Sequence, residues 1–194
     1  GEVPSLAELR LHQSTVWLWN RPVYDDADNG HLRIEMRTLP AGPTAVDMVA
    51  NAAFLIGLAE YARPGIAELL PGIPFSKAEY NFYRAAQHGL DARLLWPELD
   101  QSGYREQDVG VVIERLLPGA QQGLESIGVQ TEEAMRYLRV VQGRLEKRQT
   151  GSIWQRAKLQ ILRENMSREE ALNALLEHYI GNSRENAPVA EWSL

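Results

Sequence analysis

A segment of alternating character, residues 31–39, constrains most strongly what this chain can fold into. On a β-strand, Leu32, Ile34 and Met36 lie on one face. The opposite face carries only polar and charged side chains, namely His31, Arg33, Glu35 and Arg37. The strand continues directly into Leu-Pro-Ala-Gly-Pro-Thr and a very apolar helix. This context predicts a strand deep in the fold, whose charged face lines a cavity.

Glu35 and Arg37 are two residues apart and therefore point in the same direction from the strand. A carboxylate that can hold a cation, beside a guanidinium that can hold a phosphate or carboxylate, suits ATP-driven ligation. Other interpretations stay open at this stage. One is that Glu35 forms only a cross-strand ion pair, which contributes little, and another is that Arg37 pairs with Glu35 or with an acidic helix residue.

Composition limits the class of protein. The 194 residues suffice for one sizeable domain, or for a domain with an appendage. The net charge is −6 and there is no basic block, so nucleic acid is not an expected partner. The absence of cysteine excludes disulfides and thiolate metal sites, and it fits a reducing compartment. We therefore expect a cytoplasmic protein.

Two features bear on how the chain relates to a whole protein and to membranes. Gly1 is not an initiator methionine, so we expect a tag remnant followed by a fragment cut from a longer protein, and no signal peptide is visible. The longest apolar stretch, Val46 to Ala59, contains Asp47 and Asn51 and is too short to span a bilayer. It is expected to be a buried helix, with no membrane as partner.

The first part of the chain predicts a β-hairpin. Residues 14–21 are rich in β-branched and aromatic types and are expected to form a strand that ends at Pro22. A polar turn with Asn29-Gly30 follows, and the strand over 31–39 returns antiparallel to the first. Since an isolated hairpin is only marginally stable, we expect it to complete a larger sheet.

After Pro43 the chain is expected to be helical throughout. Thr44 and Asp47 have capping-box spacing and start a helix to about Arg63, and Ser76 and Glu79 start another that Gly89 ends. Residues 91–104 are mixed, with a turn at Trp96-Pro97. Further helices are expected at about 105–127, interrupted at Pro118, and at 131–147, 152–164 and 167–180.

These elements predict an α+β fold that is mostly α: a β-hairpin followed by a helical bundle. The expected organisation is one domain, itself part of a longer protein. Residues 1–43 form the strand pair that completes a catalytic sheet, 44–181 form the helical region and 182–194 form an extended tail.

Four motifs, taken together and in order, resemble a known family. They are Trp19-Asn20-Arg21-Pro22, the segment 31–44, Asn81-x-x-Arg84-Ala85 leading to Gly89-Leu90-Asp91-Ala92, and Thr150-Gly151-x-x-Trp154-Gln155-Arg156. Over about residues 12 to 160, the chain resembles the C-terminal part of the bacterial glutamate–cysteine ligase type 2 family. This family includes the carboxylate–amine ligases. The strand motif is the most specific of the four.

The resemblance implies a glutamine synthetase-like catalytic sheet and an ATP-dependent ligase with Mg²⁺. Such enzymes phosphorylate the γ-carboxylate of glutamate and let the amine of cysteine, or a related amine, displace the phosphate. In the wider superfamily an E-x-R pair supplies a metal-binding carboxylate and an arginine that faces phosphate or substrate. Glu35 and Arg37 match that pair. The other metal-binding carboxylates would come from strands upstream of this chain, so the isolated fragment is expected to be inactive.

The sequence departs from the family pattern at two positions. An arginine is commoner where Leu18 stands, and polar residues are commoner where Met36 stands. These departures indicate a divergent member, with an altered substrate or with lost activity.

The remaining candidate residues follow from the same motifs. Arg21 is placed at the mouth of the cleft as a catalytic residue, and Arg33 is placed against nucleotide or carboxylate. Asn81 and Arg84, three apart on one helix face, and Arg156 are candidates for substrate binding. The alternatives are a solvated turn for Arg21, a solvated helix face for Asn81 and Arg84, and simple exposure for Arg156.

A second class of function stays open, namely a non-catalytic helical interaction module that keeps a ligase-like skeleton. In either class the apolar Val46–Ala59 helix and the uncovered side of the hairpin are expected to expose apolar surface. Self-association into a homo-oligomer through the strand edges is therefore expected.

Overall fold

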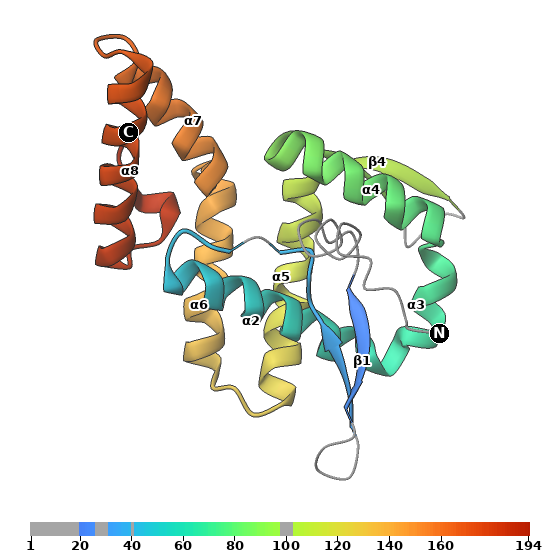
Figure 1. Cartoon of the computed structure of the whole chain (residues 1–194). Coiled ribbons are helices and arrows are strands. Elements are labelled where there is room, and N and C mark those ends of the chain that lie inside the picture. Colours follow the sequence, from blue (N-terminus) through green and yellow to red (C-terminus); the bar gives the residue numbers. More distant parts are fainter. Residues whose placement is uncertain (1–19, 26–30, 40, 98–102) are drawn as a thin grey trace, which may run out of the picture. The chain divides into compact units, whose positions relative to one another are not determined.

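The computed structural model describes residues 20–25, 31–39, 41–97 and 103–194 (Figure 1). The chain forms two compact units, Gly1–Ala41 and Gly42–Leu194. Most of the strand expected over 14–21, and the turn expected before His31, lie outside the described residues. The described part is mostly helical with short antiparallel strand pairs, which confirms the α+β, mostly α class.

The first unit contains an antiparallel hairpin. Strand β1, Arg21–Asp25, pairs with β2, His31–Glu35, and the register places Arg21 opposite Glu35. The structure confirms an antiparallel hairpin with a strand that starts at His31, but its first strand runs from Arg21 to Asp25 and does not end at Pro22 as predicted. Pro22 lies inside β1, as a two-stranded ribbon permits, since every strand in it is an edge. Strand β2 ends at Glu35, and beyond it the Arg37 amide donates to the Asn20 side chain.

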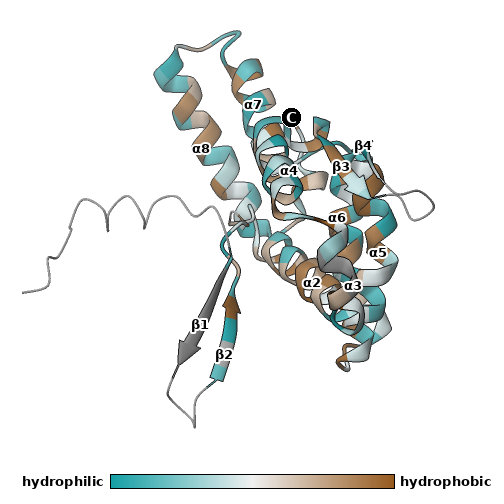
Figure 2. Ribbon diagram, turned by 90° about the vertical axis from the view of Figure 1, so that its right-hand side faces the viewer, coloured by the Kyte–Doolittle hydropathy of each residue, from teal (hydrophilic) through white to brown (hydrophobic). Residues whose placement is uncertain are grey.

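The apolar side of β2 is not buried within the first unit. The exposed fractions of Ile34 and Met36 are 58 % and 43 %, and the end of β2 is apolar in Figure 2. These values contradict the predicted deep strand, and they agree with the expectation that the hairpin exposes an apolar side. The alternating pattern specified a strand but not the surface that would cover it.

The core of the second unit is built on three helices. Helix α2, Ala45–Ala62, packs against α5, Val109–Ser126, and α6, Thr131–Glu146 (Figure 1). Gly57 of α2 lies directly against α5, because a Cβ there would come within 2.2 Å of the Ala120 carbonyl oxygen. The buried apolar side chains between the helices are Ala50, Ala120, Leu124, Ala134, Leu138, Val140 and Val141.

Helix α2 begins as the sequence predicts. The Thr44 hydroxyl caps it by accepting from the Asp47 amide at 3.1 Å. Its outer face is apolar and exposed at Met48, Val49 and Ile56. By length and composition, Ala45–Gly65 is the one helical segment among the described residues that could cross a membrane, a test that core helices also pass. Of its 18 residues only Asp47, Ala50 and Gly57 are buried, so the prediction of a buried helix is wrong, although one face of α2 packs on α5 and α6.

A second hairpin lies in this unit and was not predicted. Strand β3, Arg93–Pro97, pairs with β4, Tyr104–Asp108, and β3 packs on α4, Phe75–His88. The predicted turn at Trp96-Pro97 is wrong, because both residues pair with β4, and the helix predicted from about Arg105 begins only at Val109. The segment Tyr-Arg-Glu-Gln-Asp has no apolar alternation, so only its pairing with β3 makes it a strand.

Helices α4 and α5 differ from the boundaries that the sequence predicts. Helix α4 begins after Pro74 with no side-chain cap, so the predicted Ser76–Glu79 box is wrong, although Gly89 ends the helix as predicted. Helix α5 continues through Pro118, because its buried face packs on α2 on both sides of the proline. The short elements η2, Arg63–Gly65, and α3, Ile66–Gly72, connect α2 to α4, and η3, Gly89–Asp91, follows α4.

The C-terminal part is a helical hairpin whose end folds back. Helix α7, Gly151–Leu162, is followed by α8, Arg168–Glu185, which begins with the predicted Ser167–Glu170 capping box. Residues 182–194 are not an extended tail. Helix α8 continues to Glu185, and η4, Val189–Glu191, then brings Trp192 against Trp154, with ring centroids 4.9 Å apart.

Candidate functional site

The strongest candidate site is the end of β2, where the structure brings together residues of two sequence motifs. Arg37 Nη2 lies 2.9 Å from Glu35 Oε2. The Arg37 backbone amide donates to Asn20 Oδ1 at 3.0 Å. Because Asn20 directly precedes β1, this bond joins the start of one strand to the residues that follow the other. The predicted proximity of Glu35 and Arg37 is present in the structure.

The two charged groups differ in exposure. The Arg37 side chain is 11 % exposed and the Glu35 side chain is 42 % exposed. A guanidinium taken largely out of water loses hydration, which an adjacent carboxylate offsets only in part. The Glu35 carboxylate, in contrast, stays open enough to meet a ligand. The pair therefore presents an accessible anionic oxygen beside a cation that the hairpin holds in place.

Mg²⁺ fits this site only in part. Magnesium is commonly held by one or two carboxylates together with phosphate oxygens and water. Glu35 provides one such carboxylate. Elsewhere in the described part of the chain, no group of three or more His, Cys, Asp or Glu side chains is arranged to hold a metal ion. Further ligands would have to come from ATP and from outside the described residues.

The two other candidate residues of the hairpin are Arg33 and Arg21. Arg33 is exposed, and its Nη1 lies 3.0 Å from His31 Nε2. The backbone of Arg21 pairs with Glu35 across the hairpin, while the side chain of Arg21 lies outside the described part of the structure. The roles predicted for both arginines stay predictions.

Asn81 has a structural role in the second unit. Its Nδ2 donates to the Leu95 carbonyl oxygen at 2.9 Å, and its Oδ1 accepts from the Leu95 amide at 2.7 Å. The side-chain amide thus pairs with β3 as a neighbouring strand would, and it joins α4 to the second hairpin. This pairing gives a physical reason for Asn81 that needs no substrate, and substrate binding by Asn81 stays a prediction.

Arg84 and Arg156 lie on different helices of the same unit. Arg84 Nη1 lies 2.9 Å from His88 Nε2, one turn further along α4, and Arg84 Nε is buried without a hydrogen-bond partner among the described residues. Arg156 is exposed on α7. Their predicted part in substrate binding stays untested by these contacts.

The sequence did not reveal the most buried charged group of the second unit, Asp47. This side chain is fully buried, and its Oδ1 accepts from Arg144 Nη2 at 2.7 Å and from Arg144 Nε at 3.1 Å. Its Oδ2 accepts from the Thr44 hydroxyl and from the Val189 amide. Asp47 therefore ties α2 to α6 and to the C-terminal segment. Arg144 is 97 residues away, so no local spacing could have indicated the pair.

No family model, curated protein or solved structure matches this chain. Its function is therefore inferred from the site's own residues and from the motif resemblance.

Proposed function

We propose that this chain supplies the C-terminal part of an ATP-dependent carboxylate–amine ligase that resembles the glutamate–cysteine ligase type 2 family. The observation that carries the proposal is the Glu35–Arg37 pair at the end of β2, with Asn20 bonded to the Arg37 amide. A metal-binding carboxylate and a phosphate-binding arginine are what the E-x-R motif supplies in that superfamily. The proposed substrates are glutamate and cysteine or a related amine, and the proposed location is the cytoplasm.

The proposed reaction has two steps. An oxygen of the glutamate γ-carboxylate attacks the γ-phosphorus of ATP, and the bond to the bridging oxygen breaks to release ADP. The amine then attacks the acyl carbon, phosphate leaves, and the amine nitrogen loses a proton. Mg²⁺ would neutralise charge on the ATP phosphates. Glu35 would hold that ion, and Arg37 would donate to the equatorial oxygens of the transferring phosphoryl group.

The uncovered hairpin supports the proposal that the active site continues outside this chain. Ile34 and Met36 expose apolar surface that a neighbouring strand or helix would bury. Glu35 also supplies one carboxylate, and no group of three or more metal-ligating side chains is present among the described residues to complete a site for Mg²⁺ and ATP. We therefore propose that the isolated chain is inactive and that the protein containing it is the enzyme.

The test uses the full-length gene product that contains this chain, supplied with ATP, Mg²⁺, glutamate and hydroxylamine. An acyl phosphate is trapped by hydroxylamine as glutamyl hydroxamate, with release of phosphate. The proposal predicts hydroxamate and ADP in equal amounts, and a loss of about 100-fold in Glu35→Gln. Glu106→Gln is the matched control, since Glu106 pairs with Arg93 in the second hairpin, and it should keep activity. A folded wild-type protein that forms neither product would contradict the proposal.

The alternative proposal is a non-catalytic helical interaction module. The observation that favours it is the exposed apolar face of α2 at Met48, Val49 and Ile56, which resembles a surface for another protein or another copy. This alternative predicts a folded full-length protein that does not bind Mg²⁺-ATP.

A further inference from the structure

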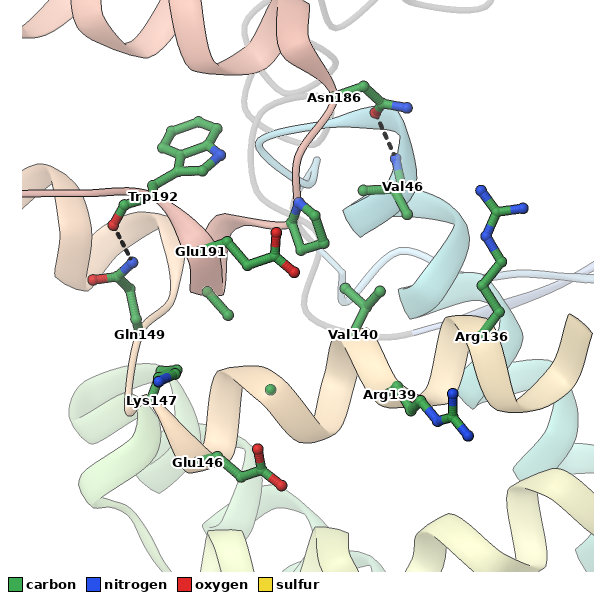
Figure 3. A pocket seen from close by; sticks show the side chains of 13 residues that line it. Val46, Arg136, Arg139, Val140, Glu146, Lys147, Gln149, Asn186, Glu191 and Trp192 are labelled. Carbon is green, nitrogen blue, oxygen red and sulfur yellow. Dashed lines mark hydrogen bonds between the residues drawn. The ribbon is translucent and has the colours of Figure 1, made fainter. Parts of the chain in front are cut away.

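A cavity of about 900 Å³ lies in the second unit, and none of the residues that line it belongs to the hairpin that carries the proposed function. One wall is a face of α6 and the other is the C-terminal segment after α8 (Figure 3). Its apolar lining includes Val46, Val140, Pro188 and Ala190. The volume is within the range of sites for small molecules, and such sites combine an apolar surface with a few polar groups.

The C-terminal wall is held in place rather than loosely attached. The Val189 amide donates to Asp47, and the Gln149 side chain donates to the Val189 and Trp192 carbonyl oxygens at 2.7 and 2.9 Å. The Trp154 indole donates to the Ser193 carbonyl oxygen at 3.0 Å. Since these bonds join the segment to α2, to the α6–α7 connection and to α7, the cavity is formed before any ligand arrives.

Gly143 keeps the cavity open because it has no side chain to fill it. Gly143 lies in the last turn of α6, where glycine is less favourable than alanine. Nothing in the packing requires it, because a Cβ at this position would meet only the Ala190 Cβ, at an ordinary contact distance of 3.7 Å. A larger side chain at position 143 would instead occupy the cavity.

The charges around the cavity are separated by sign. Arg136 and Arg139 lie on one side of Val140, and Glu146, Lys147 and Glu191 lie on the other (Figure 3). The first side is cationic, and the second has two carboxylates against one ammonium. Glu146 accepts from the Gln142 side chain at 2.8 Å, which steadies one of these carboxylates.

The geometry points to a short zwitterionic peptide as the ligand of this cavity. Arg139 and Glu146 are seven residues apart on α6, so they are separated by about 10 Å along the helix axis. An extended tripeptide also spans about 10 Å between its ends. Its carboxylate would meet Arg136 and Arg139, its ammonium would meet Glu191 and Glu146, and its side chains would contact Val140 and Ala190. This inference does not depend on the proposed ligase function.

The test probes the chain with the tripeptide Ala-Val-Ala in three forms: free, N-acetylated and C-amidated. Binding is followed by the NMR shifts of the Gly143 and Ala190 amides, since both residues line the cavity. The free peptide should bind best, and each capped form should bind about three- to fivefold more weakly, as expected for the loss of one partly exposed ion pair. Equal binding of all three forms, or no shift at millimolar peptide, would overturn the inference.

Substitutions of residues that line the cavity test whether the peptide binds there. Gly143→Leu should lower the affinity at least about tenfold by filling the cavity. Gly143→Ala is its control and should fold at least as stably as wild type while still binding the peptide. If Gly143→Leu does not fold, Arg139→Gln serves instead, and it should narrow the difference between the free peptide and its C-amide. Unchanged binding in a folded Gly143→Leu variant, or an unchanged preference in Arg139→Gln, would overturn the assignment.

Discussion

The two hairpins of this molecule contain similar residues but differ in which side chains they bury. Hairpin β3–β4 is packed on α4 and α5, and Leu94 is 8 % exposed within a cluster with Ala92 and Val109. Hairpin β1–β2 instead leaves Ile34 and Met36 exposed. Both hairpins carry an arginine–glutamate pair, Arg93–Glu106 at 3.5 Å and Arg37–Glu35 at 2.9 Å.

The difference shows that strand pattern and strand environment are separate properties. The covered hairpin buries its apolar side and exposes both members of its ion pair, which therefore contributes little to folding. The uncovered hairpin exposes its apolar side and buries most of the Arg37 guanidinium, at a cost in hydration. The two hairpins therefore differ in what they bury, which is the apolar Leu94 side chain in one and the Arg37 guanidinium in the other.

The largest effect that tests this comparison is a loss of core packing. Leu94→Ala should lower the free energy of unfolding by about 2–4 kcal/mol, since it removes buried methyl groups and leaves a cavity. Ile34→Ala, the matched change in the exposed hairpin, should cost less than about 0.5 kcal/mol. Urea denaturation of both variants measures the difference. Similar losses in the two would contradict the contrast between the hairpins.

A smaller effect concerns how the covered hairpin is attached. Asn81→Ala should lower the free energy of unfolding by about 1–3 kcal/mol, because the Leu95 amide and carbonyl both lose their partner. Asn173→Ala, at an exposed position of α8, is the control and should change stability little. If Asn81→Ala were as stable as the control, the side-chain amide would not be what holds β3 to α4.

The uncovered hairpin should promote self-association of this chain. Sedimentation at rising concentration is expected to show oligomers, and Ile34→Lys should weaken association about tenfold by charging the exposed apolar side. Ile161→Lys, at an exposed apolar position of α7, is the control and should leave association unchanged. A wild-type chain that stays monomeric at high concentration would show that the exposed apolar side of this hairpin does not drive self-association.

The smallest expected effect concerns the capping box at the start of α8, which lies outside both hairpins. The pKa of Glu170 is lowered because the Ser167 hydroxyl and the Ser167 backbone amide hydrogen-bond its carboxylate. A lowered pKa means that this contribution is present at neutral pH and is lost as pH falls through the pKa of Glu170. Glu170→Gln keeps a capping amide at every pH, so its thermal unfolding should show a slightly weaker pH dependence than wild type at acidic pH. Identical pH profiles would show that the capping box adds nothing measurable.

Local signals in the sequence predicted the parts of the fold that depend on neighbouring residues. The cap at Thr44, the capping box at Ser167, the end of α4 at Gly89 and the β1–β2 hairpin are confirmed. The second hairpin was missed because β4 is polar and becomes a strand only by pairing with β3. The Asp47–Arg144 pair and the folding back of Trp192 join residues far apart in the chain, which no short motif specifies.

The candidate site was likewise predictable from the sequence only in its local contacts. Glu35 and Arg37 are in contact although β2 ends at Glu35, and their spacing of two residues indicated this contact. The engagement of Asn81 with Leu95 was not predictable, since its partner belongs to the strand that the sequence did not reveal.

The most direct test of the central claim is Mg²⁺-ATP binding by calorimetry on the full-length gene product. Wild type, Glu35→Gln and Glu106→Gln are compared, so that each hairpin loses one carboxylate. If the uncovered hairpin carries the metal site, wild type and Glu106→Gln bind Mg²⁺-ATP and Glu35→Gln binds at least about tenfold more weakly. A folded wild-type protein that does not bind, or a Glu35→Gln variant that binds as wild type does, would contradict the account.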